Sequence, residues 1–216
     1  MNALFTDRAD AGRQLADALL QDYGRHGNLL VLGLPRGGVP VAYEVAARLH
    51  APLDVLVVRK LGAPMNREYA MGAIAPGGIT ILKQDVVCAL NIRQEAIAQV
   101  IEIESAELDR RVDAYRGDRP PPVVADRTII VVDDGLATGS TMQAAIMAIR
   151  QQDPALIVAA VPVASSEAHQ LIRREADRIV CLATPAIFRA VGLWYVSFPQ
   201  TSDAQVTELL ARSRSA

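Results

Sequence analysis

Most of this chain alternates between continuous apolar runs and helical patterns, and this alternation limits its fold more than any other feature. Four runs read as buried strands, over residues 28–34, 53–58, 128–132 and 156–163. Helical patterns follow three of them, over about residues 39–49, 140–152 and 166–176, and a short strand pattern at 178–182 ends the series. Runs without polar alternation indicate strands that are covered on both faces. The sequence therefore predicts an α/β fold with a parallel twisted sheet and helices on both faces.

Further elements are predicted around this series. Capping residues are expected at the starts of three helices: Thr6, Asn91 with Gln94, and Ser202 with Gln205. The remaining predictions are a long loop at 59–69, short strands at 71–75, 79–83 and 194–198, and a charged helix from 91 to about 115. In a parallel sheet of this kind, ligands bind at the carboxyl ends of the strands. Three loops fall there: 35–38, 59–69 and 133–141.

Composition narrows the class of protein. With 216 residues, 51% of them hydrophobic, the chain can form one domain with a substantial core. A net charge of -2 argues against a general nucleic-acid surface. Two distant cysteines, Cys88 and Cys181, suit a reducing compartment, and the three histidines show no metal-binding spacing. The first residues lack a signal-peptide pattern and no run is long enough to cross a membrane, so we expect a cytoplasmic protein without a membrane partner.

The most informative segment is VVDDGLATGST, from Val131 to Thr141. It enters from an apolar run, contains two adjacent carboxylates, and leads through a Gly-rich turn into a helical pattern. Backbone N–H groups at a helix N-terminus favour phosphate. Carboxylate oxygens accept hydrogen bonds from a vicinal diol such as a ribose. Together the two features predict a ribose 5-phosphate site.

Other nucleotide-binding loops fit this segment poorly. An ATP-binding P-loop needs four residues between its glycines and then a Lys. Here three residues separate Gly135 from Gly139, and Ser140 stands where the Lys would be. No GxGxxG follows any predicted strand, so a dinucleotide fingerprint is also absent. Asp133 and Asp134 followed by Gly135 would alone suggest an ordinary turn, but the whole strand-to-helix context argues against that interpretation.

The segment resembles the signature of type I phosphoribosyltransferases, which bind 5-phosphoribosyl 1-pyrophosphate (PRPP). In that family, four apolar residues, two acidic residues and a short spacer precede T-G-[ST]-T. The resemblance implies that Asp133 and Asp134 bind the ribose hydroxyls. It also implies that the loop beginning at Gly135 holds the 5-phosphate, through Ala137, Thr138, Gly139, Ser140 and Thr141. The closest resemblance is to a group of uncharacterised bacterial phosphoribosyltransferase-like proteins that share the VRKLGAP loop and the DDGLATG motif.

The resemblance implies roles for the two other loops. Arg36, Gly37 and Gly38 would bind the pyrophosphate, with a non-proline cis peptide at Arg36–Gly37 or a neighbouring bond. Arg59 and Lys60 would add positive charge, so that the implied catalytic set is Arg36, Arg59, Lys60 and Asp134. The loop beyond them corresponds to a mobile loop over the reacting centre, with Arg67 and Tyr69 as its candidate side chains.

By resemblance, the chain would transfer the phosphoribosyl group of Mg-PRPP to a nitrogenous base or amine and release pyrophosphate. Mg²⁺ would be held mainly through PRPP, with Asp133 and Asp134 as candidate direct ligands. Enzymes for 6-oxopurines carry an acidic residue where this chain has Ala137, which argues against hypoxanthine or guanine as acceptor. Trp194 and Tyr195 are candidate base-binding residues, although aromatic residues of a local core are an equal alternative.

The resemblance implies a single phosphoribosyltransferase domain with a Rossmann-like core. The expected boundaries are a core at about 28–182, a helical insertion at about 84–122, and a C-terminal hood and helix at about 183–216. Relatives are commonly dimers, so a homodimer is one expectation. The alternative function is a non-catalytic regulator of the same fold that senses PRPP or nucleotides.

Overall fold

A computed structural model describes residues 3–24, 27–117 and 119–215, without the side chains of residues 67 and 68. Its centre is a five-stranded sheet in the order β2-β1-β6-β7-β8, and every pairing is parallel. The strands are β1 (Leu29–Gly33), β2 (Leu53–Val55), β6 (Thr128–Val132), β7 (Leu156–Val163) and β8 (Arg178–Ala183). The predicted α/β fold with a parallel sheet is confirmed.

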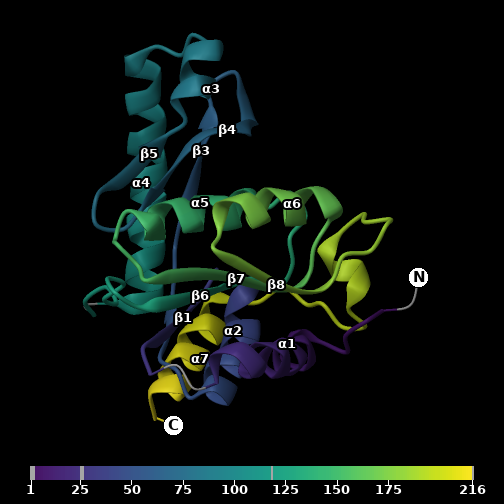
Figure 1. Ribbon diagram of the computed structural model, residues 1–216. Coiled ribbons are helices and arrows are strands. Elements are labelled where there is room, and N and C mark those ends of the chain that lie inside the picture. Colours follow the sequence, from purple (N-terminus) through teal and green to yellow (C-terminus); the bar gives the residue numbers. More distant parts are fainter. Residues whose placement is uncertain (1–2, 25–26, 118, 216) are drawn as a thin grey trace.

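Helices cover both faces of this sheet (Figure 1). One face carries α5 (Ser140–Arg150) and α6 (Ser166–Glu175), and the other carries α1 (Arg8–Tyr23), α2 (Gly38–Leu49) and α7 (Asp203–Ser215). Alternate strand residues divide between two apolar cores, since Val31 packs in one and Leu30 with Leu32 in the other. All five residues of β1 are buried, as expected for a strand covered on both sides. No helix in the described part of the chain is long and apolar enough to span a membrane.

The chain between β2 and β6 forms a separate unit. A three-stranded antiparallel sheet, β3 (Arg59–Ala63), β4 (Asn66–Ala75) and β5 (Ile79–Leu82), leads into α3 (Gln84–Ala89) and the long α4 (Gln94–Arg116). Figure 1 shows this unit rising beyond α5, with α4 running back along the end of the main sheet. The prediction of a long loop at 59–69 is therefore wrong. Gly62 lies in β3 beside register shifts at Leu61–Gly62 and Gly62–Ala63, and Pro64 lies in the tight turn between β3 and β4.

Several predicted element ends need correction. The N-cap of α1 is Asp7, whose carboxylate accepts from the Asp10 N–H, so the predicted cap Thr6 lies one residue before the actual cap. α4 has Arg93 as its N-cap without a side-chain cap, because Asn91 adopts a left-handed conformation at the preceding turn. The strand expected at 194–198 is replaced by the 3₁₀ helix η1 (Val191–Trp194) and a single bridge between Phe5 and Tyr195.

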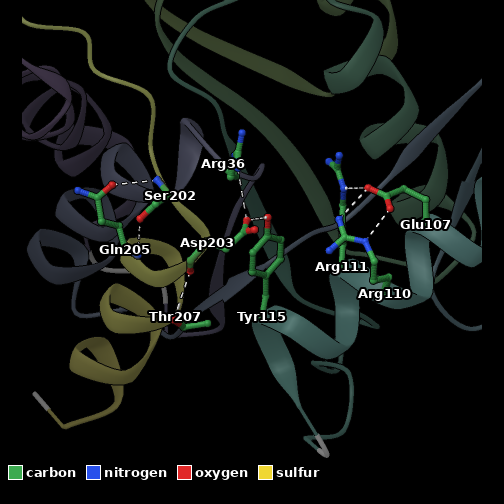
Figure 2. Close-up of polar contacts among 9 residues, drawn as sticks. All are labelled: Arg36, Glu107, Arg110, Arg111, Tyr115, Ser202, Asp203, Gln205 and Thr207. Carbon is green, nitrogen blue, oxygen red and sulfur yellow. Dashed lines mark hydrogen bonds and ion pairs between the residues drawn. The ribbon is translucent and has the colours of Figure 1, made fainter.

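The capping box at the last helix is confirmed. The Ser202 N–H donates to Gln205 Oε1 at 2.9 Å, and the Gln205 N–H donates to Ser202 Oγ at 3.2 Å (Figure 2). The reciprocal pair satisfies two N–H groups at the start of α7. It fixes the place where α7 begins, and this places Asp203, the first residue of the helix, beside the loops at the carboxyl edge of the sheet.

Candidate functional site

Loops from three neighbouring strands meet at the carboxyl edge of the main sheet. β2, β1 and β6 are adjacent and parallel, so the chain leaves all three strands on the same side. The Leu34 N–H donates to the Val132 carbonyl at 2.9 Å, and the Leu56 N–H donates to the Gly33 carbonyl at 3.0 Å. The strand ends that precede the predicted Pro35–Gly38, Arg59 and Asp133 segments are thus held side by side.

The first loop packs against the acidic pair. A Cβ atom built on Gly37 would lie 2.0 Å from Asp134 Oδ2, and one built on Gly38 would lie 2.6 Å from the Val132 carbonyl oxygen. Only glycine permits so close an approach of the backbone. The peptide bond between Pro35 and Arg36 is cis, one bond before the Arg36–Gly37 bond that the resemblance suggested first. The structure therefore brings the Gly37–Gly38 segment and the carboxylates into direct contact.

Burial disfavours the charged forms of both carboxylates. The pKa of Asp133 is raised well above its ordinary value, first by desolvation and then by the neighbouring Asp134 charge. Desolvation also raises the pKa of Asp134, while the Arg8 guanidinium opposes this. The Asp134 N–H donates to Asp133 Oδ1 at 2.9 Å and holds that side chain in place. Two adjacent acids short of positive charge favour a cationic or hydrogen-bond-donating ligand.

Arg8 is a site residue that the sequence analysis missed. Its Nε donates to Asp134 Oδ2 at 2.8 Å, and one terminal nitrogen donates to the Pro199 carbonyl at 2.6 Å. Its guanidinium carbon lies 3.7 Å from the centre of the Phe198 ring. These contacts join the start of α1, the acidic pair and the C-terminal segment. No sequence signal could have found Arg8, since 126 positions separate it from Asp134.

The second loop has the features of an anion cradle. Gly139 is the N-cap of α5 and adopts a left-handed conformation (φ 75°). Because glycine has no side chain, it makes no side-chain hydrogen bond to the first N–H groups of the helix. Thr138 and Ser140 place their hydroxyl oxygens 3.1 Å apart at this helix end. Ala137, Thr138 and Thr141 are exposed, so this part of the loop faces outward. The N-terminus of α5 provides N–H groups and a partial positive charge for a phosphate.

Ser165, at the N-cap of α6, holds the second loop through hydrogen bonds to its backbone. Its hydroxyl donates to the Ala137 carbonyl at 2.8 Å, and its N–H donates to the Leu136 carbonyl at 2.9 Å. The Leu136 N–H donates in turn to the Val163 carbonyl at 2.9 Å. Gly135 has no room for a side chain, because its Cβ would lie 2.6 Å from a methyl group of Val191. The loop is therefore anchored to the end of β7 and to η1, which favours a preorganised site.

Arg36 faces an acid of α7 that also accepts a hydrogen bond from a tyrosine of α4 (Figure 2). One of its terminal nitrogens lies 3.7 Å from Asp203 Oδ1, at the start of α7. The same oxygen accepts a hydrogen bond of 2.5 Å from the hydroxyl of Tyr115, near the end of α4. Desolvation, with this hydrogen bond, raises the pKa of Tyr115 to about 12. Asp203 and Tyr115 are thus candidate positioning residues for Arg36, and neither belongs to a motif that the sequence displays.

Arg59 and Lys60 lie at the start of β3, beside the first loop and α4. Both line a cavity of about 580 Å³ that also contacts Pro35 of the first loop and Thr141 of the second. Arg59 Nε donates to Glu104 of α4 at 2.7 Å. Tyr69 lies on β4 with an exposed side chain, and Arg67 shares that strand while its side chain lies outside the described residues. The role of these two residues in a mobile loop stays a prediction, and the segment that carries them is a strand paired with β3.

The two aromatic residues proposed for base binding are buried. Trp194 and Tyr195 are 7% and 5% exposed, in an apolar cluster that includes Phe5. The Tyr195 hydroxyl donates to the Asp134 carbonyl at 2.6 Å, and its ring lies 4.8 Å from that of Phe198. Through these contacts Tyr195 packs against the backbone of the acidic pair, and its ring is covered by neighbouring aromatic rings. Base binding by Trp194 and Tyr195 stays a prediction, and their burial favours the alternative of a local aromatic core.

Comparisons with known proteins agree with this geometry. The family model of the phosphoribosyl transferase domain matches residues 4–195. Two Mycobacterium tuberculosis proteins, "Putative phosphoribosyl transferase MT0597" (strain CDC 1551 / Oshkosh) and "Putative phosphoribosyl transferase Rv0571c" (strain ATCC 25618 / H37Rv), are each 47% identical over 210 residues, or 97% of this chain. The chain spans about half the length of these relatives, 47% in each case.

A solved structure supports the same assignment. The crystal structure of TT1426 from Thermus thermophilus superposes with a TM-score of 0.88 at 40% identity. The match covers 96% of this chain and 98% of TT1426, so the insertion between β2 and β6 is included. The resemblance on which the sequence analysis relied is confirmed over nearly the whole chain. The chain belongs to the phosphoribosyl transferase domain family.

Proposed function

We propose that this protein binds Mg-PRPP across the two loops and transfers the 5-phosphoribosyl group to a nitrogenous acceptor. The observation that carries the proposal is the contact between Gly37 and Asp134, which joins a Gly-rich loop to a part-buried acidic pair beside the N-terminus of α5. In the reaction, the bond from ribose C1 to the diphosphate oxygen breaks and a bond from C1 to the acceptor nitrogen forms. The sugar becomes cation-like between these events.

Each part of the site has a role in this proposal. The loop from Gly135 to Thr141 would bind the 5-phosphate on its N–H groups and hydroxyls. Asp133 and Asp134 would accept hydrogen bonds from the ribose 2- and 3-hydroxyls, and their negative charge would favour the cation-like sugar. Arg36, Gly37 and Gly38 would hold the diphosphate, with the guanidinium offering paired donors to its oxygens.

The residues present fit a magnesium ion that arrives with PRPP. Mg²⁺ prefers oxygen ligands and usually keeps bonds to phosphate and water. Asp133 and Asp134 are adjacent oxygen donors whose pKa values are raised first by desolvation, so a nearby cation would stabilise their charged forms. No cluster of three or more His, Cys, Asp or Glu side chains able to hold a metal exists among the described residues. When bound, the ion would neutralise charge on the departing diphosphate.

A pyrophosphate-release assay tests the proposal. The protein would be mixed with Mg²⁺, PRPP and one acceptor from a panel of adenine, guanine, hypoxanthine, xanthine, uracil, orotate and simple amines. We expect release with at least one acceptor and a loss on the order of a hundredfold in Asp134→Asn, since charge at the reacting sugar is removed. PRPP binding without release for any acceptor would contradict the transferase and favour a PRPP sensor.

A further inference from the structure

The cavity beside the two loops has a wall that the core fold does not supply. Its described lining includes Pro35 and Thr141, from the first and second loops, and residues of β3. The opposite wall is α4, which contributes Gln99, Glu104 and Arg111 among others. Helix α4 belongs to the unit between β2 and β6, so this unit helps to build the site rather than only decorating the surface.

The charge of the cavity favours an anion. Among its described lining residues, Arg59, Lys60 and Arg111 are basic, and Glu104 is the acidic one. Glu104 pairs with Arg59, and the side chains of this pair are 21% and 27% exposed. Three basic side chains therefore line one cavity of about 580 Å³, with Arg59 paired to Glu104 and Arg111 to Glu107. Basic side chains gathered on a concave surface can donate together to the oxygens of an anionic ligand.

Glu107 holds Arg111 in an extended position along α4. The carboxylate accepts from Arg111 Nε at 2.6 Å and from Arg110 Nε at 2.7 Å, so two adjacent arginines share one acid (Figure 2). Arg111 is the more buried of the two, with 33% of its side chain exposed against 61% for Arg110. Arg111 lines the cavity, and Arg110 is not among the lining residues. The helix therefore carries a matched pair of arginines, of which one faces the cavity.

We propose that Arg111 of α4 is a diphosphate-binding residue that completes the cationic cavity formed with Arg59 and Lys60. The proposal rests on the proposed function, since the diphosphate is that of PRPP or of the released product. The Nε of Arg111 is used by Glu107, and its two terminal nitrogens carry the remaining donors toward the ligand. Arg59 and Lys60 of β3 would bind the diphosphate from one wall of the cavity and Arg111 of α4 from the opposite wall.

The two arginines allow a controlled experiment. Binding of Mg-pyrophosphate, Mg-PRPP and ribose 5-phosphate would be measured by calorimetry for wild type, Arg111→Ala and Arg110→Ala. Each variant removes one positive charge and one partner of Glu107, so long-range electrostatics change alike, and Arg110→Ala removes two hydrogen bonds to Glu107 where Arg111→Ala removes one. We expect Arg111→Ala to weaken pyrophosphate and PRPP binding on the order of tenfold, as for the loss of a charge-assisted hydrogen bond. Arg110→Ala should stay within about twofold of wild type.

Further arms separate the outcomes. Arg111→Lys keeps the charge but loses the paired donors, so its affinity for pyrophosphate should fall between those of wild type and Arg111→Ala. Ribose 5-phosphate affinity should be the same in all variants, because it lacks the diphosphate. Equal affinities of Arg111→Ala and Arg110→Ala for pyrophosphate would overturn the inference while leaving the proposed function intact. A wild-type protein that binds neither pyrophosphate nor PRPP would overturn both.

Discussion

Gly37→Ala is expected to abolish PRPP binding and to lower the stability of the protein. The backbone of Gly37 has φ −65° and ψ −30°, which any L-residue adopts, so the substitution causes no backbone strain. The new methyl group would instead lie 2.0 Å from Asp134 Oδ2 and 2.7 Å from Asp134 Cγ. Since carbon atoms in contact need about 3.5–4 Å, either the carboxylate or the first loop must move.

The consequences reach Arg8 as well as the ligand site. Asp134 Oδ2 is the atom that accepts from Arg8 Nε at 2.8 Å, so displacement of the carboxylate breaks a mostly buried ion pair. We expect a loss of about 2 kcal/mol in the free energy of unfolding and a fall in PRPP affinity on the order of a hundredfold. Denaturant unfolding and calorimetry would measure the two effects.

Gly27→Ala is the matched control, because a Cβ at Gly27 would meet no atom within 4 Å. It should leave stability and binding unchanged. A Gly37→Ala protein that binds Mg-PRPP like wild type would show that the first loop does not lie against Asp134 as described.

Asp133→Asn is expected to stabilise the protein more than Asp134→Asn does, although both impair function. The pKa of Asp133 is raised by burial, and its side chain accepts from the Asp134 N–H, a bond that an Asn side-chain oxygen can also accept. Removing its charge should therefore stabilise the protein near neutral pH, by about 1 kcal/mol. Burial also disfavours the charge of Asp134, but Asp134→Asn loses the ion pair with Arg8, so its gain in stability should be smaller than that of Asp133→Asn.

The pH dependence of stability provides a second test of the predicted stabilisation by Asp133→Asn. Because folding raises the pKa of Asp133, the folded state binds this proton more tightly than the unfolded state does. Protonated Asp133 therefore contributes to the stability of the wild-type protein at low pH. This contribution is lost as the pH rises from the ordinary Asp pKa of 3.8 through the raised pKa of Asp133. Thermal unfolding in metal-free buffer should show the advantage of Asp133→Asn growing with pH over that range. An advantage that shrinks with rising pH would contradict the assignment.

The sequence predicted the parallel sheet well because its strands depend on local signals. β6 and β7 match the predicted runs at both ends, since each is continuous and apolar between polar turns. The DDGLATGST segment lies on one strand-to-helix turn, so its residues stay together whatever the rest of the fold does. The Gly37–Gly38 contact could be predicted only once the sheet order brought β1 beside β6.

The partners of the site residues could not be predicted, for a physical reason. Arg8, Asp203 and Tyr115 reach the site through tertiary packing of α1, α7 and α4, and each looks like an ordinary residue of a charged helix. The pairing of residues 59–69 was missed because Gly62 and Pro64 suggest a coil, whereas the pairing depends on the antiparallel neighbour. The aromatic residues Trp194 and Tyr195 were sensible base-binding candidates by type, but their contact with Phe5 is set by the N-terminal segment packing over η1.

The most direct test of the account is a calorimetric titration of the wild-type protein and Asp134→Asn with PRPP in the presence of Mg²⁺. Binding needs no knowledge of the acceptor, so it examines the two loops alone. The account predicts saturable binding of one PRPP per chain by wild type and its loss in Asp134→Asn, with Arg110→Ala binding like wild type. Absence of PRPP binding by the wild-type protein would contradict the assignment of residues 131–141 and of the whole site.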